Sequence, residues 1–143
     1  MADSAGPAVS EILRRHFPEA ETEAAVVPDE EDQIAAKLER WCARGAALVL
    51  TVGGTGMSPR DRTPEATRQV IAREAPGLAE AMRSHGAQKN AFAWLSRGIA
   101  GLKGRTLIVN LPGSRRGATE SLESIIDLLR HAIEVAEGGQ SHP

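Results

Sequence analysis

Apolar residues recur at helical spacing in several stretches of the chain. Near the N-terminus, Val9, Ile12 and Leu13 fall at positions i, i+3 and i+4, which lie on one face of a helix. The same spacing recurs toward the C-terminus, and prolines typical of a first helical position mark the starts of three helices. The predicted helices cover residues 7–17, 30–43, 63–74, 76–82 and 118–137.

Short apolar runs alternate with these helices and predict buried strands at residues 22–27, 47–52 and 106–109. Strands that alternate with helices indicate one three-layer α/β/α domain with a mainly parallel sheet. We assign this domain to residues 1–137 and a flexible tail to residues 138–143.

Composition narrows the class of function. The formal net charge of −2 argues against electrostatic binding to nucleic acid or to a membrane surface. The one cysteine, Cys42, excludes an internal disulfide and a multi-cysteine metal site. No apolar run approaches the roughly 18 residues that cross a bilayer, and the N-terminus lacks a signal-peptide pattern. We therefore predict a cytoplasmic protein.

A glycine-rich segment directly follows the apolar run at residues 47–52. It contains Gly53, Gly54 and Gly56, and an acid, Asp61, comes a few residues later. A buried strand that feeds such a loop presents backbone N–H groups to phosphates at the carboxyl end of a sheet. The alternative is a tight connection in which the glycines serve only the geometry of the turn.

Two common phosphate-loop motifs are excluded. A Walker A loop ends in Gly-Lys-Ser/Thr, and residues 51–67 contain no lysine. The dinucleotide motif G-x-G-x-x-G fails because its last position is Pro59.

Residues 51–67 resemble, almost letter for letter, the T-x-G-G-T-G-x-x-P-R-D-x-T-P-E-A-T signature of the molybdenum cofactor biosynthesis family. That family includes the Mog/MoaB-type proteins, the molybdopterin adenylyltransferases and the G domain of gephyrin. Residues 105–114 are similar to its T-L-I-x-N-L-P-G-S segment, and residues 28–30 resemble its V-P-D-E turn. The resemblance runs from about Asp3 to about Ile133.

The resemblance implies a molybdopterin-binding fold, a homotrimer and a nucleotidyltransferase that acts on ATP and molybdopterin with Mg²⁺. It makes Asp61 and Asp29 the catalytic residues and the ligands of Mg²⁺. From the residues alone, Asp29 is also a helix N-cap, and Asp61 a turn former or part of a surface charge pair. The roles of Ser96, Arg97, Arg115 and Arg116 stay open. The substrate-binding residues that it implies are Thr51, Gly53, Gly54, Thr55, Gly56, Ser58, Asn110, Pro112, Gly113 and Ser114.

The chain departs from the family pattern at its N-terminus. Relatives open with an apolar strand and a serine-containing turn before the segment that matches residues 3–7, and this chain begins inside that segment. In the family the strand is interior to the sheet, so its absence leaves backbone groups of two neighbouring strands unpaired. Either Met1 is not the natural start or the chain is a shortened variant, and the activity of these residues stays open.

Two other functions compete with adenylyl transfer. One is a Mog/MoaB-like protein, or a truncated paralogue, that binds molybdopterin with little or no catalysis. The other is the related domain of competence-damage-type proteins, which act on other nucleotides. The two long motifs match the adenylyltransferase and gephyrin pattern more closely.

Overall fold

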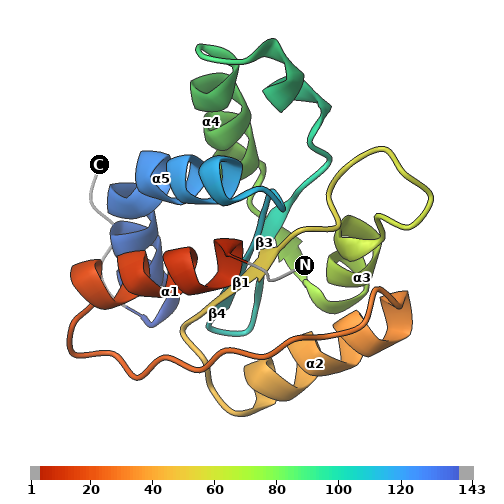
Figure 1. Ribbon diagram of the computed structural model, residues 1–143. Coiled ribbons are helices and arrows are strands. Elements are labelled where there is room, and N and C mark those ends of the chain that lie inside the picture. Colours follow the sequence, from red (N-terminus) through yellow and green to blue (C-terminus); the bar gives the residue numbers. More distant parts are fainter. Residues whose placement is uncertain (1–3, 139–143) are drawn as a thin grey trace.

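This computed structural model describes residues 4–138. A four-stranded sheet lies at the centre of the fold (Figure 1). The strand order is β1-β4-β3-β2. β1 pairs with β4 in parallel, whereas β3 is antiparallel to both of its neighbours. The strands are β1 (Leu48–Val52), β2 (Arg73–Glu74), β3 (Ala100–Lys103) and β4 (Thr106–Leu111).

Helices cover both faces of this sheet (Figure 1). One layer holds α1 (Ala5–His16), α4 (Pro76–Ala87) and α5 (Arg115–Ala136). The other layer holds α2 (Glu31–Ala43) and α3 (Thr63–Val70), and a short 3-10 helix, η1 (Ala91–Leu95), follows α4. The three-layer α/β arrangement predicted from the sequence is thus confirmed. Within residues 4–138, no helix is long and apolar enough to cross a membrane.

β4 is one of the two interior strands, and every one of its residues is buried. Because successive side chains of a strand point to opposite faces, Leu107, Val109 and Leu111 join the core under α1, α4 and α5. Ile108 joins the second core under α2 and α3. An apolar strand buried on both faces therefore holds the two helical layers together.

The structure corrects the predicted sheet in two respects. The sheet is mixed rather than mainly parallel, because β3 and β4 form an antiparallel hairpin with Gly104 in the left-handed region, at φ 59°. The helix predicted over residues 63–74 ends at Val70, and Arg73 and Glu74 pair with β3 instead. The glycines between residues 98 and 104 hid this hairpin from the sequence analysis.

The strand predicted over residues 22–27 does not form. This segment is extended but unpaired, and Val26 is 95% exposed. Among the described residues β1 is an edge strand, and a groove of about 740 Å³ separates it from residues 21–27. A strand needs a neighbouring strand with which to form a ladder of hydrogen bonds. Among the described residues no strand lies between β1 and residues 22–27, which explains why the predicted strand does not form.

The open edge of β1 generates a prediction about stability. A version of the protein that carries an added N-terminal apolar strand, fitted to this groove, is expected to gain at least about 2 kcal/mol in free energy of unfolding, because it pairs several backbone groups. Urea unfolding and size-exclusion chromatography of both versions measure the gain. The control is the same extension with prolines at alternate positions, which cannot donate to the ladder. Equal stability of the three proteins would refute the prediction.

Candidate functional site

The parallel pairing of β1 with β4 brings two loops to one edge of the sheet. The last pair in the register is Val52 with Leu111, and the Gly53 N–H donates to the Leu111 carbonyl at 3.0 Å. A Cβ atom on Gly113 would lie only 3.2 Å from the Gly53 Cα. The two turns therefore pack backbone against backbone, which is possible because both positions are glycine.

The loop after β1 closes on the start of α3. Gly54 has φ 71°, in the left-handed region, and its carbonyl accepts from the Thr63 N–H at 3.1 Å. The Thr63 side chain occupies the space that a Cβ atom on Gly54 would need. Residues 55–62 thus form an excursion whose two ends are tied together at its base.

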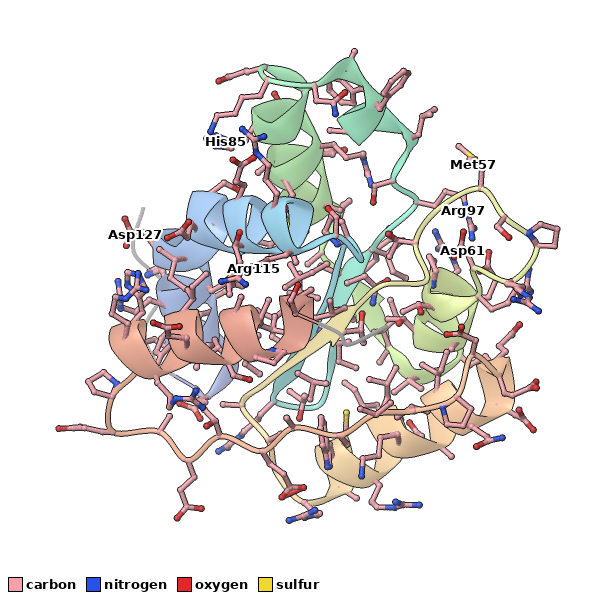
Figure 2. The ribbon with its side chains drawn as sticks, in the orientation of Figure 1. Met57, Asp61, His85, Arg97, Arg115 and Asp127 are labelled. Carbon is pink, nitrogen blue, oxygen red and sulfur yellow. The ribbon has the colours of Figure 1, made fainter. Side chains whose placement is uncertain are left out.

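Asp61 folds back onto this excursion. Its Oδ2 atom accepts from the Ser58 N–H at 3.0 Å and lies 2.8 Å from the position of a Cβ atom on Gly56. The half-buried Asp61 carboxylate therefore lies directly beside the glycine backbone. Figure 2 shows Asp61 near Arg97, while Met57 is on the outer part of the loop.

The turn after β4 starts α5. The Ser114 hydroxyl accepts from the Gly117 N–H at 3.0 Å, which makes Ser114 the N-cap of the helix. The unpaired N–H groups and the positive end of the helix dipole favour an anion at this terminus. Both loops thus offer backbone donors at the same edge of the sheet.

A cleft of about 700 Å³ lies between these loops and the segment from α4 to β3. It is lined by most of the residues predicted from the sequence. These residues are Gly54, Thr55, Gly56, Asp61, Asn110, Pro112, Gly113 and Ser114.

The remaining predicted residues lie elsewhere. Asp29, Thr51 and Gly53 line the groove beside β1, and Gly54 borders both hollows. Ser58 is exposed on the loop, where it shapes the turn that holds Asp61. The structure therefore does not bring the carboxylates of Asp29 and Asp61 into one hollow.

Asn110 is only 2% exposed, and its side chain is bound within the protein. Its Nδ2 atom donates to the hydroxyls of Thr51 at 2.9 Å and Thr67 at 3.0 Å. Its Oδ1 atom accepts from the Ile99 N–H at 3.1 Å. Both amide hydrogens are thus used, and Asn110 ties β4 to β1, to α3 and to the segment before β3.

Further charged residues line the cleft: the sequence analysis missed Arg83, Lys89 and Glu120, and it left the role of Arg116 open. Lys89 and Arg116 contact the Glu120 carboxylate at 3.4 Å and 3.3 Å. Burial raises the pKa of Glu120, but hydrogen bonds from Arg116 and Lys89 outweigh burial and hold the pKa below its ordinary value. With Arg83, the cleft has three cationic residues against two acids, which suits an anionic ligand.

The four residues left open are now placed. Ser96 and Arg116 line the cleft, and Arg97 contacts the glycine-rich loop. In Figure 2, Arg115 lies between α5 and α1, away from Asp61.

The half-buried Asp61 carboxylate, which lies beside the glycine-rich loop, is a suitable ligand for Mg²⁺. This ion commonly binds through one or two carboxylates together with substrate phosphates and water. Among residues 4–138, no three histidine, cysteine or acidic side chains cluster as a metal site. A protein-only metal cage is therefore not formed by the described residues. The chemistry of Asp61, a half-buried carboxylate beside backbone donors, fits a cation that would be shared with a substrate phosphate.

Comparisons with known proteins show which family the chain is similar to. A family model described as a probable molybdopterin binding domain matches residues 1–131. A molybdopterin adenylyltransferase of Helicobacter pylori is 36% identical over 138 residues, which is 95% of this chain and 78% of that protein. The molybdenum cofactor synthesis protein cinnamon of Drosophila melanogaster is 40% identical over 93% of this chain and 22% of its own length.

The fold of this chain is also similar to that of a solved structure. The molybdopterin biosynthesis enzyme MoaB of Thermus thermophilus is 49% identical with a TM-score of 0.85, over 96% of this chain and 87% of that one. The chain spans less than half the length of several curated relatives that it matches.

The buried network of Asn110 yields a prediction. Asn110→Ala is expected to lower the free energy of unfolding by about 2–4 kcal/mol, since three hydrogen bonds of the interior are lost. Urea unfolding measures the loss. Asn90→Ala is the control, because Asn90 is exposed and accepts one bond, from the Phe92 N–H at 3.0 Å; its loss should stay at about 1 kcal/mol or less. Equal losses in the two variants would mean that the Asn110 network adds nothing to stability.

Proposed function

The chain belongs to the family of probable molybdopterin binding domains in molybdenum cofactor biosynthesis, and on that premise we propose that it is a molybdopterin adenylyltransferase. The observation that supports this most is the cleft in which the glycine-rich loop, the half-buried Asp61 and the N-terminus of α5 meet. A substrate with phosphate at one end and a polar ring at the other suits such a cleft.

The proposed reaction joins AMP to molybdopterin. An oxygen of the terminal phosphate of molybdopterin attacks the α-phosphorus of ATP. The bond between that phosphorus and the oxygen bridging to the β-phosphate breaks, and pyrophosphate leaves with the electron pair. The products are adenylyl-molybdopterin and pyrophosphate.

Such a reaction requires positioning and charge neutralisation more than covalent chemistry by the protein. N–H groups of the loop at Gly54–Gly56 would bind anionic oxygens, and Ser114 and Gly113 would hold a second phosphate at the start of α5. Lys89 and Arg116, which line the cleft, would attract anionic substrate to it. Asn110 supports these loops from the interior instead of contacting substrate through its amide hydrogens.

Asp61 would hold Mg²⁺ beside the phosphates. The ion, when bound, neutralises charge that develops on the phosphate oxygens during transfer. The Asp29 carboxylate lies in the neighbouring groove, so its part in the same metal site remains a prediction. Homotrimer assembly and a cytoplasmic location also remain predictions.

A direct assay tests the proposal. Purified protein is incubated with molybdopterin and Mg-ATP, and adenylyl-molybdopterin and pyrophosphate are quantified by mass spectrometry and a coupled assay. Equal amounts of the two products, dependent on protein concentration, are expected. The assay is run on the 143-residue protein and on the version with the added strand.

A second candidate is a protein that binds molybdopterin with little catalysis. The separation of Asp29 from the cleft favours it, because a single carboxylate then faces the substrate. Tight binding of molybdopterin without any ATP-dependent product, in both versions of the chain, would support this candidate and refute the transferase.

Replacement of Asp61 by Asn distinguishes a metal ligand from a pocket wall. The Asn side chain keeps an oxygen that can accept from the Ser58 N–H, so the loop retains its shape while the negative charge is lost. We expect kcat to fall by about 10²–10³ and the dissociation constant of molybdopterin to change less than about threefold.

Asp32→Asn is the matched control, because Asp32 is an exposed acid in the first turn of α2. Its kcat should equal that of the unmodified protein. If Asp61→Asn keeps more than about a tenth of the original rate, Asp61 does not act at the reacting phosphates.

A further inference from the structure

The Arg97 side chain and backbone donate several hydrogen bonds to the glycine-rich loop. Its Nε atom donates to the Gly56 carbonyl at 2.8 Å, and its Nη2 atom donates to the Asp61 carbonyl at 2.6 Å. The two carbonyls belong to opposite ends of the excursion at residues 55–62. One guanidinium therefore spans the loop from its first limb to its last (Figure 2).

A carboxylate and a backbone bond fix the guanidinium in this place. Its Nη1 atom donates to Glu65 Oε2, on α3, at 2.6 Å. The backbone N–H of Arg97 donates to the Thr55 carbonyl at 2.8 Å. The hydrogen bond from Arg97 lowers the pKa of Glu65, and the same bond raises the pKa of Arg97, so both partners stay charged at neutral pH.

The segment that carries Arg97 is itself held from α4. The Nη1 atom of Arg83 donates to the carbonyls of Ser96 at 3.1 Å and Gly98 at 2.9 Å. Arg83 and Ser96 line the cleft, so the arginine that grips the loop is anchored by a wall of the same cleft. Two arginines in series thus connect α4 to the glycine-rich loop.

These bonds set the orientation of peptide groups as well as the position of the loop. In a trans peptide the carbonyl and the following N–H point in opposite directions. The bond from the Arg97 N–H to the Thr55 carbonyl turns the N–H of Gly56, which lines the cleft, away from Arg97. The bonds to the carbonyls of Gly56 and Asp61 do the same for the N–H groups of Met57 and Arg62. The peptide groups of the loop are therefore held in one orientation.

We propose that Arg97 is a positioning residue that clamps the glycine-rich loop, so that the loop N–H groups and the Asp61 carboxylate are preset for a phosphate-bearing substrate. This role in catalysis rests on the proposed adenylyl transfer, whereas the clamp itself is a property of the loop. Arginine suits the task because its rigid fork presents several donors in one plane, which a lysine ammonium cannot reproduce.

Arg97→Gln tests the clamp by kinetics. A misplacement of about 1 Å at reacting groups costs on the order of 10²-fold in rate. We expect kcat to fall by about 10–100-fold and the dissociation constant of molybdopterin to change less than about threefold, because the other residues that line the cleft are unchanged. Arg97→Lys should recover only part of the rate, since it restores the charge without the fork.

Hydrogen exchange supplies a readout independent of the reaction. Amides of residues 56–58 and 60–62 should exchange at least tenfold faster in Arg97→Gln, while those of α5 remain unchanged. Glu65→Gln removes one acceptor and leaves both loop carbonyls bound, so it should give a smaller rise in a protein that stays folded. Arg68→Gln is the control, because it removes a cation from α3 that has an exposed pair with Glu74.

The outcomes separate the clamp from the proposed function. An unchanged exchange rate in residues 56–62, or a kcat within threefold of the unmodified protein, overturns the proposal. Faster exchange over the loop and α5 alike would show general destabilisation and overturn it too. If the unmodified protein forms no adenylyl-molybdopterin, the proposed function fails, and loop-specific exchange in Arg97→Gln and Glu65→Gln alone then decides whether the clamp exists.

Discussion

The candidate site depends on the parallel register of β1 with β4. Five residue pairs, from Leu48 with Leu107 to Val52 with Leu111, make both strands end at the same edge of the sheet. Gly53 and Gly113 then continue the contact beyond the strands, with backbone against backbone. A side chain at Gly113 would crowd the Gly53 backbone, and a side chain at Gly53 would be strained because its φ is 97°. The close approach of the glycine-rich loop to the start of α5 therefore depends on this register and on these glycines.

The buried amide of Asn110 connects the paired strands to α3. Asn110 stands opposite Thr51 in the β1–β4 pairing and also bonds Thr67 of α3 and the N–H of Ile99. Burial of an amide is unfavourable unless its donors and acceptors are paired, and an apolar side chain here would leave the Ile99 N–H without this acceptor. The polar residue thus acts as a specific connector in a strand that is otherwise apolar.

The sequence predicted the features that are local in the chain and missed those that depend on distant segments. The apolar runs and the glycine pattern were sufficient for β1, β4 and the loop that holds Asp61. They could not show that the Asn110 amide is consumed within the protein, because its partners are dozens of residues away. Arg83 and Glu120 were missed because each lies on a helix, where charged residues usually face solvent. Their contacts with distant segments are not visible in the sequence. The strand at residues 22–27 failed because strand propensity has no effect without a neighbour to pair with.

The groove beside β1 borders the candidate site. Both hollows share Gly54, and the groove contains Asp29, the second acid that the family resemblance implies. Asp29 follows an extended segment without ladder hydrogen bonds, so its position is set less firmly than that of Asp61, which the Arg97 clamp and the Ser58 N–H hold. A strand seated in the groove would order residues 21–27 through its own ladder and fix the start of α2 against Gly54. The position of Asp29 relative to the cleft therefore depends on what pairs with the open edge of β1, outside the cleft itself.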